Sequence, residues 1–305
     1  LNSMVRITFW LALTFFSLAT KPLHGQIRYK DSLFSDIETK TLTYSDTLQL
    51  DVYLPKNDAV LERPLVLLVH GGGFASGKRD NPLERKFCIE MASKGYVTVS
   101  MSYRLTRKGK SFGCDCPTKE KIETFADATY DMAEAINFLI ERKDDLGIDP
   151  SKMIWVGSSA GAEAVLNTAF MQYHHDFGDV SFPQEKPAGV VSFAGAVLDA
   201  NYITDKTAVP TLLYHGKMDR LVPYASAAHH YCEPGSPGYL ILGGSQTIAK
   251  RLSQLNTPYM LMYDSSGNHD WANLAYERTD EISAFIRDVI IDGVFVQSKI
   301  RLVKK

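Results

Sequence analysis

The sequence carries little net charge. Its 33 lysine and arginine residues nearly balance its 35 aspartate and glutamate residues, which leaves a formal charge of -2 over 305 residues. A protein that binds nucleic acid or an anionic membrane surface needs basic side chains concentrated on one face. Because the two signs are mixed along this chain, we expect no nucleic-acid partner and favour a small neutral substrate.

Motifs that hold metals and nucleotides are also missing. The sequence contains no HExxH pair, no Walker A loop and no GxGxxG after an apolar run. Cys114 and Cys116 have no second pair of ligands at zinc-finger spacing. We therefore expect neither a metal ion nor an organic cofactor.

Apolar runs long enough to cross a membrane are absent. The most apolar stretch, residues 7–16, follows Arg6, whereas a helix that spans the ~30 Å hydrocarbon core needs about 20 apolar residues. A basic start followed by a short apolar stretch is typical of a secretory signal peptide. Residues 1–25 are therefore interpreted as a signal peptide, with no stable membrane insertion and a secreted or periplasmic location.

Two positions fit signal cleavage, one after Ala19 and one after Gly25. Residues 1–3 are expected to precede the natural start of the chain at Met4. The remaining residues, 26–305, are sufficient to bury a full core, so we expect them to form a single domain.

Cysteine is scarce, with four residues in the chain. Export favours an oxidising compartment in which cysteines can pair. Cys88 lies in an apolar, helix-like segment that is typical of a buried thiol. Cys114 and Cys116 are too close in sequence to pair comfortably with each other. Either can pair with Cys232, and the alternative is that all four thiols are free.

Six short apolar runs are typical of strands buried on both faces of a parallel sheet. They are residues 65–69, 97–101, 153–156, 190–193, 211–214 and 259–263. Helix-like segments with apolar residues at three- and four-residue spacing lie between them, most clearly over 126–141. Residues 39–54 alternate polar and apolar side chains, as antiparallel strands do, and the Pro/Gly-rich residues 233–244 are expected to be a loop. The pattern predicts an α/β fold with a doubly wound, mostly parallel central sheet, helices on both faces and antiparallel N-terminal strands.

Residues 157–161 read GSSAG and stand between a predicted strand and a predicted helix over 162–169. A serine on such a tight strand-to-helix turn has an exposed hydroxyl, and only small neighbours fit beside it. Gly157 and Gly161 are those neighbours. We therefore interpret Ser159 as a nucleophile, the alternative being an ordinary turn with an inert serine.

A serine nucleophile that attacks an acyl carbon also needs donors for the negative charge that develops on the carbonyl oxygen. Residues 70–74 read HGGGF directly after the predicted strand 65–69. Glycines let the backbone approach a substrate with its N–H groups free. The amides of Gly72, Gly73 and Ala160 are therefore the predicted oxyanion hole.

A base and a carboxylate complete this chemistry, and in chain order the carboxylate comes first. Asp219 follows the predicted strand 211–214 and is the expected carboxylate, with Asp199 and Asp205 as substitutes. His269 follows the last predicted strand and is the expected base. His229 and His230 are the rival bases, although no strand precedes them directly.

Together these motifs resemble the α/β-hydrolase superfamily, and within it the carboxylesterases similar to the hormone-sensitive-lipase-like and feruloyl/acetyl esterase-like groups. The resemblance covers about residues 39–291. It is carried by HGGGF at 70–74, SYRL at 102–105, GSSAG at 157–161, and HG at 215–216 with Asp219 and Pro223. Ser158 stands where the hormone-sensitive-lipase-like pattern usually has aspartate, and TRK at 106–108 replaces its Ala-Pro-Glu.

The resemblance and the motifs imply a secreted serine carboxylesterase with a Ser159-His269-Asp219 triad and an acyl-enzyme intermediate. The expected substrate is a short-chain acyl ester or an aromatic ester, including carbohydrate-linked esters. A peptidase or amidase with the same triad and a non-catalytic ligand-binding protein are the alternatives. Residues 105–121, 171–187 and 221–245 are expected to form the pocket walls.

Overall fold

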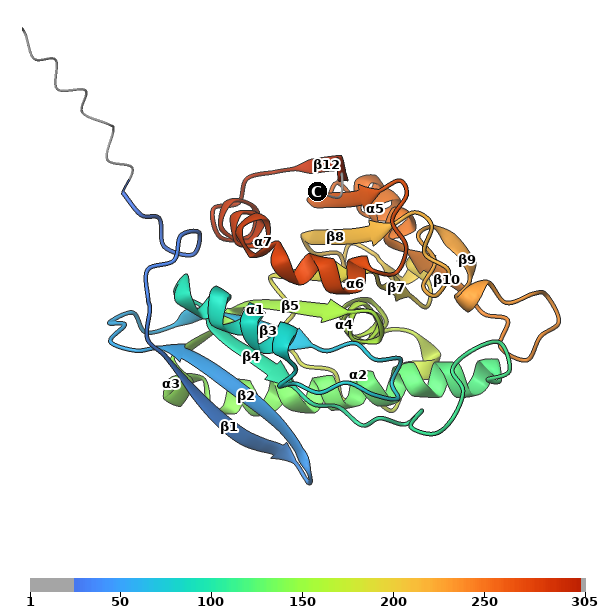
Figure 1. Ribbon diagram of the computed structural model, residues 1–305, viewed down its shortest axis with the longest axis horizontal. Helices are drawn as coiled ribbons and strands as arrows, with labels where there is room; N and C mark the ends of the chain where they lie inside the picture. The colour runs from blue at the N-terminus through green and yellow to red at the C-terminus, as the bar shows by residue number, and fades with distance from the viewer. Residues whose placement is uncertain (1–24, 303–305) are drawn as a thin grey trace, which may run out of the picture.

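The computed structural model describes residues 25–302, and Figure 1 shows a central sheet with helices on both sides. Apart from Gly25, the predicted signal peptide lies outside the described residues. The central sheet has nine strands within residues 25–302, in the order β1-β2-β4-β3-β5-β6-β8-β11-β12. Their bounds are β1 (Ile37–Ser45), β2 (Leu48–Pro55), β3 (Arg63–Val69), β4 (Val97–Met101), β5 (Ile148–Ser158), β6 (Gly189–Phe193), β8 (Thr211–Gly216), β11 (Tyr259–Asp264) and β12 (Gln297–Leu302).

The sheet is mostly parallel, as the sequence predicts. Strand β2 pairs antiparallel with both β1 and β4, and the pairs from β4 through β3, β5, β6, β8 and β11 to β12 are all parallel. All six predicted strands lie within β3, β4, β5, β6, β8 and β11. Because parallel strands share one direction, their carboxyl ends meet at one edge of the sheet, where ligands bind in such folds.

Helices cover both faces of the sheet and bury a separate apolar core on each (Figure 1). One core lies under α2 (Thr118–Glu141), α4 (Ala160–Phe170) and α5 (Ser245–Gln254). The other lies under α1 (Pro82–Ser93), α6 (Trp271–Leu274) and α7 (Thr279–Phe285). The short helix α3 (Lys143–Leu146) follows α2. In the part of the chain described, none of the helices combines the length and the apolar character needed to cross a membrane.

Two strand groups differ from the sequence prediction. Strand β12 is an edge strand of sequence QSKIRL, and its polar side chains give no apolar run. A small antiparallel sheet joins β7 (Ala196–Val197), β10 (Ile241–Gly244) and β9 (Ser226–Ala228). Strand β10 lies in the segment 233–244, so the prediction of a loop is wrong for its last four residues. Two of those four residues are glycines, which strand patterns disfavour.

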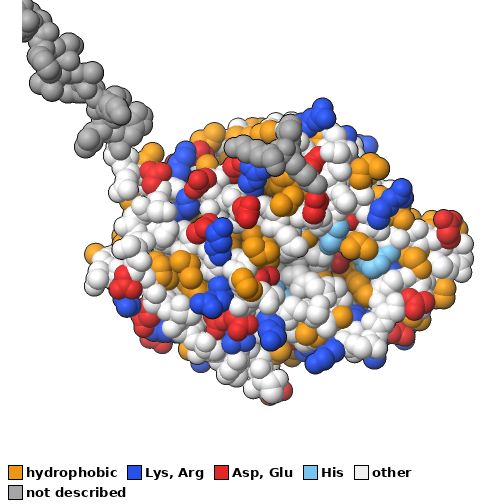
Figure 2. Space-filling view, viewed as in Figure 1, with side chains coloured by type: hydrophobic (Ala, Val, Ile, Leu, Met, Phe, Trp, Pro, Cys, Tyr) orange, Lys and Arg blue, Asp and Glu red, His pale blue; other side chains and the backbone are white. Residues whose placement is uncertain are grey.

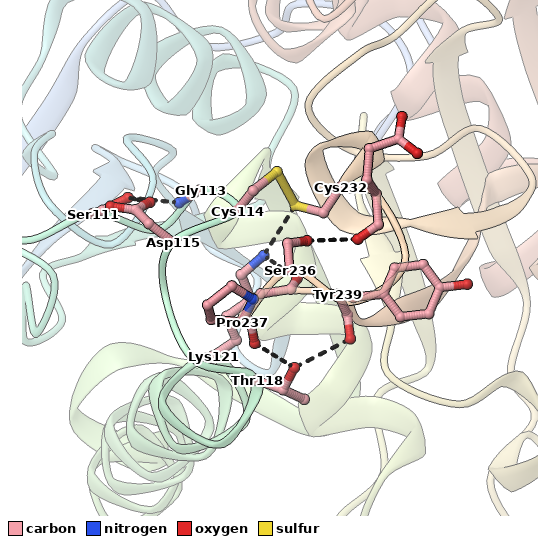
Figure 3. The surroundings of a disulfide bond; sticks show 12 residues. Ser111, Gly113, Cys114, Asp115, Thr118, Lys121, Cys232, Ser236, Pro237 and Tyr239 are labelled. Carbon is pink, nitrogen blue, oxygen red and sulfur yellow. Dashed lines mark hydrogen bonds between the residues drawn. A yellow bond between two sulfur atoms is a disulfide. The ribbon is translucent and has the colours of Figure 1, made fainter.

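A disulfide joins Cys114 to Cys232 (Figure 3). It links the loop before α2 to the loop before β10, and backbone hydrogen bonds run beside it. The N–H of Gly238 donates to the carbonyl of Cys114 at 2.9 Å, and the N–H of Thr118 donates to the carbonyl of Pro237 at 2.9 Å. Cys116, the alternative partner, is a buried free thiol, as is Cys88.

Replacing Cys114 with serine should lower the free energy of unfolding by about 4 kcal/mol, because the bridge closes a long loop in the unfolded chain. The two cysteines are 118 residues apart. Urea denaturation of the oxidised proteins measures the effect. Cys116→Ser, which leaves the bridge intact, is the matched control and should cost much less. Equal losses in the two variants would contradict a stabilising Cys114–Cys232 bridge.

Candidate active site

Ser159 occupies a sharp turn between β5 and α4. Its backbone angles, φ 51° and ψ -121°, lie in a region that non-glycine residues rarely adopt. Strained residues of this kind are concentrated at functional sites, where the surrounding structure holds them in place. Here the N–H of Ser159 donates to the carbonyl of Phe193 at 2.8 Å. The turn is therefore fixed by the neighbouring strand β6.

The glycines that flank Ser159 are required by close packing. A Cβ on Gly157 would lie 2.3 Å from the carbonyl oxygen of Gly161, and a Cβ on Gly161 would lie 2.2 Å from the carbonyl oxygen of Val69. Both distances are far below van der Waals contact. The turn thus brings the start of α4 directly against the end of β3.

The three side chains predicted to act together lie in one hydrogen-bonded row. The hydroxyl oxygen of Ser159 is 2.7 Å from Nε2 of His269, and Nδ1 of His269 is 2.7 Å from Oδ2 of Asp219. Ser159 follows β5, Asp219 follows β8, and His269 follows β11. Their meeting at the carboxyl ends of three strands is a direct consequence of the parallel sheet.

Asp219 is fully buried and is surrounded by donors. Its Oδ1 accepts from the N–H groups of Leu221 at 2.8 Å and Val222 at 3.0 Å. Burial acts to raise the pKa of Asp219, but hydrogen bonds from His215 and His269 outweigh it and hold this pKa well below its ordinary value. The carboxylate is therefore ionised at neutral pH and can stabilise a positive charge on His269.

The sequence did not predict a role for His215 at this site. Its Nε2 is 3.2 Å from Oδ2 of Asp219, and its Nδ1 is 2.8 Å from the hydroxyl of Ser245. The spacing of four residues between His215 and Asp219, across a turn that leaves a strand, is a signal that sequence reasoning could have used. His215 thus contacts Oδ2 of the carboxylate, whereas the backbone donors bind Oδ1.

The amides predicted to bind an oxyanion face the same cavity as Ser159. Gly72 and Gly73 have φ of 121° and 61°, and Ala160 is the first residue of α4. No hydrogen bond between described residues uses the N–H of Gly72 or Gly73, and the first amides of a helix have no partner within it. All three residues line the cavity beside Ser159. These donors are free to bind a negatively charged oxygen.

The cavity has a volume of about 610 Å³, and Figure 2 shows histidine side chains gathered beside a hollow on one face of the molecule. Two of the three predicted walls contribute to it. Phe112 comes from residues 105–121, and Leu221 is one of several lining residues from 221–245. Residues 171–187 do not line it. Within them, the ring of His174 packs at a tilt against Tyr202, with centroids 4.6 Å apart.

Glu163 and His229 form a second polar pair in the cavity wall. Glu163 lies one helical turn after Ser159, its side chain is 2% exposed, and its Oε1 is 3.3 Å from Nε2 of His229. Burial raises the pKa of Glu163 to about 8 and lowers the pKa of His229 to about 3. Both side chains are therefore uncharged at neutral pH. Sequence reasoning missed Glu163 because its partner is distant in the sequence.

The rival residues occupy other positions. His229 and His230 line the cavity, but the ring that reaches the hydroxyl of Ser159 belongs to His269. Asp199 accepts a hydrogen bond from the N–H of Asn201 at the start of a short helical turn, and Asp205 is exposed. The geometry therefore groups Ser159 with the residues first predicted for it.

One group of described residues has metal-ligand chemistry. His174, His175 and Asp176 place their ligand atoms within 4.8 Å of one another. They do not line the cavity beside Ser159.

Comparison with protein families finds a match to the BD-FAE family over residues 50–196. This stretch contains the glycine loop and the turn at Ser159 and ends before Asp219 and His269. Among curated proteins, the chain is 30% identical over 135 residues to gut esterase 1 of Caenorhabditis briggsae, with 43% of this chain and 22% of that protein covered. It is 27% identical over 154 residues to the isoprenylcysteine alpha-carbonyl methylesterase ICME of Arabidopsis thaliana, with 50% and 32% covered.

A third curated relative is the non-reducing polyketide synthase atr1 of Stereocaulon alpinum, 29% identical over 170 residues, which are 52% of this chain and 6% of that protein. The chain thus spans a third or less of the length of these relatives.

Solved structures match over more of the chain. The butyrate-bound esterase Est2 of the planctomycete Thermogutta terrifontis matches with a TM-score of 0.57 and 18% identity, covering 84% of this chain and 95% of that one. MGS-M1, an α/β-hydrolase enzyme from a Medee basin deep-sea metagenome, matches with a TM-score of 0.54 and 17% identity over 82% and 99%.

Replacing Glu163 with glutamine should change how stability depends on pH. The folded protein keeps the Glu163 proton up to about pH 8, whereas the unfolded chain releases it near the ordinary value of 4.5. The free energy of unfolding contributed by this group therefore falls as pH rises through that interval. The pKa of His229 is lowered from its ordinary value of 6.5, so the contribution of this ring to the free energy of unfolding rises with pH below that value. That contribution is the same in the wild type and the variant.

Urea denaturation between about pH 5 and about pH 8 tests this effect. The wild type should lose stability relative to Glu163→Gln as the pH rises. Glu185→Gln, at an exposed position, is the control and should track the wild type. Identical pH profiles for wild type and Glu163→Gln would show that Glu163 is not protonated in the fold.

Proposed function

We propose that this chain, which has the α/β-hydrolase fold, is a serine esterase that hydrolyses small carboxylic esters. One observation carries the proposal. The Ser159 hydroxyl, the His269 ring and the Asp219 carboxylate form a continuous row with two distances of 2.7 Å. That row lies beside backbone amides that are free to bind an oxyanion.

In the first half of the reaction, Oγ of Ser159 attacks the ester carbonyl carbon while Nε2 of His269 takes the hydroxyl proton. The carbonyl oxygen becomes negatively charged and accepts hydrogen bonds from the amides of Gly72, Gly73 and Ala160. The carbon–oxygen bond to the alcohol then breaks. The alcohol leaves with the proton from His269, and an acyl group remains on Ser159.

In the second half, water replaces the alcohol. His269 takes a proton from the water as its oxygen attacks the acyl carbon, and the same amides hold the negative oxygen. When the bond to Ser159 breaks, the proton returns from His269 to Oγ. The carboxylic acid leaves and Ser159 is restored.

Asp219 supports both halves of the reaction through His269. Because its carboxylate is ionised and buried, it stabilises the imidazolium form that exists after each proton transfer. It also fixes the proton on Nδ1, which leaves Nε2 free to accept the proton of Ser159. His215 in turn holds Asp219 in place.

Similar proteins support an esterase. Gut esterase 1, the methylesterase ICME and the structural neighbour Est2 are all named esterases. A structure of Est2 phosphorylated by paraoxon also matches this chain, with a TM-score of 0.57 and 19% identity. The substrate is a short-chain acyl or aromatic ester, for which a cavity of about 610 Å³ has room.

The lining of the cavity supports a polar alcohol, including a carbohydrate. Lys78, Asn81 and Asn273 line the cavity and present hydrogen-bonding side chains, whereas Phe112 and Leu221 present apolar surface. Sugars are recognised through such polar groups together with apolar faces. The acyl group is accommodated against the apolar side chains.

We also propose that the protein acts outside the cytoplasm. The sequence pattern of residues 1–25 supports export. The Cys114–Cys232 disulfide supports it independently, because such bonds persist mainly in oxidising compartments.

Ser159→Ala should reduce hydrolysis of 4-nitrophenyl acetate and butyrate at least about 10³-fold, because the acyl group has no other acceptor. Adding feruloyl esters to the panel ranks the acyl groups by the rate of hydrolysis. Matched amide and peptide substrates test whether the protein is a peptidase. Ser158→Ala is the matched control. The hydroxyl of Ser158 donates to the carbonyl of Ala272 at 2.8 Å and does not contact His269, so this variant should keep most activity. Full activity in Ser159→Ala refutes the proposal.

Asp219→Asn should lower kcat by about 10⁴-fold with a much smaller change in KM, because the amide cannot stabilise the imidazolium. Steady-state kinetics with 4-nitrophenyl butyrate provide the measurement. Asp199→Asn, at the first substitute position, serves as the control and should retain wild-type kcat. Loss of activity in Asp199→Asn but not in Asp219→Asn would reverse the assignment of the carboxylate.

A further inference from the structure

Glu163 lies beside the reacting groups, yet the hydrolytic steps do not use it. Its N–H donates to the carbonyl of Ser159 at 2.9 Å, so the first turn of α4 joins the two residues. Ser159 directly precedes α4 with non-helical backbone angles, and both residues line the same cavity. The carboxyl group of Glu163 is therefore part of the wall of the cavity that receives an acyl group bonded to Ser159.

The polar atoms of this pair are not satisfied within the described residues. Oε1 of Glu163 and Nδ1 of His229 are buried without a hydrogen-bond partner, and the Oε1 to Nε2 contact of 3.3 Å lacks hydrogen-bond alignment. Buried polar groups in folded proteins nearly always have a partner. Both residues line the cavity beside Ser159. Oε2 of Glu163 and Nε2 of His229 make no hydrogen bond within the described residues and keep some accessible surface, so a substrate in that cavity can pair with these two atoms.

The surroundings of the pair define the substrate group that fits. The ring of Phe112 packs edge-on against His229 with centroids 5.1 Å apart, which places an apolar surface next to the polar atoms. Burial keeps both Glu163 and His229 uncharged at neutral pH. The carboxyl group of Glu163 therefore offers one O–H donor, and the ring of His229 offers one acceptor nitrogen and one N–H donor. A hydroxyl, which both donates and accepts, matches this arrangement.

The disulfide fixes the segment that carries His229. Cys232 is three residues beyond His229, and Cys114 is two residues beyond Phe112. The bridge between the two cysteines, drawn in Figure 3, ties these two segments together. The fully buried Lys121 donates to the carbonyl of Gly238 at 2.9 Å on the same side. His229 is therefore a fixed part of the cavity wall.

We propose that Glu163 and His229 are specificity-determining residues that bind a hydroxyl on the acyl part of the substrate, so that the protein prefers esters of short hydroxy acids. The proposal rests on the esterase function above and names its substrate class. The hydroxyl belongs to the acyl group because that group stays bonded to Ser159, the residue directly before the helix α4 that carries Glu163. The leaving alcohol must instead lie where His269 can protonate it.

The test compares 4-nitrophenyl 3-hydroxybutyrate with 4-nitrophenyl butyrate. The wild type should favour the hydroxy ester in kcat/KM by about fivefold, the value of one hydrogen bond between uncharged groups. Glu163→Met, which keeps the length of the side chain without its donor, should remove the preference. Glu163→Gln, which retains a donor and an acceptor, should restore most of it.

A second variant separates recognition from folding. His229→Phe keeps a ring against Phe112 but removes both ring nitrogens, and it should also lose the preference while hydrolysing the butyrate ester. A matched pair of alcohols, ethyl and 2-hydroxyethyl butyrate, should show no change in any variant. The proposal is overturned if both Glu163→Met and His229→Phe keep the wild-type preference for the hydroxy acyl ester. It is also overturned if the variants change only the ratio of kcat/KM between the two alcohol esters.

Binding separates failure of this proposal from failure of the esterase function. Ser159→Ala should be protected against thermal unfolding more strongly by ethyl 3-hydroxybutyrate than by ethyl butyrate, because binding of a ligand to the folded state raises Tm. When Glu163→Met is added to Ser159→Ala, the two esters should raise Tm by the same amount. If the two esters raise the Tm of Ser159→Ala equally, the hydroxyl site is refuted, even where ester hydrolysis is established.

Discussion

The buried carboxylate of Asp219 is the constraint on which the site depends. An ionised group in the protein interior is tolerated only when several donors surround it. Two backbone amides, His215 and His269 provide those donors. Satisfying Asp219 therefore positions His269, and His269 in turn reaches the hydroxyl of Ser159. The hydrogen bonds that stabilise this one buried charge thus position all three side chains of the row.

The parallel sheet makes this arrangement possible. The glycine loop, Ser159, Asp219 and His269 follow β3, β5, β8 and β11, and all four strands end at the same edge. Close packing between β3 and the start of α4, which only Gly157 and Gly161 allow, brings the oxyanion donors beside Ser159. Residues distant in the sequence thereby share one cavity, and the Cys114–Cys232 bridge fixes a further part of its wall.

The sequence predicted those parts of the molecule that local patterns encode. The six buried strands, the fold class and the turn at Ser159 follow from apolar runs and glycine spacing, and the predicted fold is confirmed. Strand β12 has polar side chains at a sheet edge and gives no such run. The choice of Cys114 over Cys116, and the pairing of Glu163 with His229, depend on how distant loops meet. No local pattern encodes such a meeting.

The turn between β5 and α4 places the hydroxyl of Ser159 against His269, whereas the hydroxyl of Ser158 donates to the carbonyl of Ala272. Ser159, and not Ser158, is therefore the proposed nucleophile. Treatment with paraoxon followed by mass spectrometry of the proteolytic peptides tests it most directly. We expect one diethylphosphoryl group per chain, located on Ser159 and absent when His269 is replaced by alanine. A phosphoryl group on Ser158, or an unmodified chain, would contradict it.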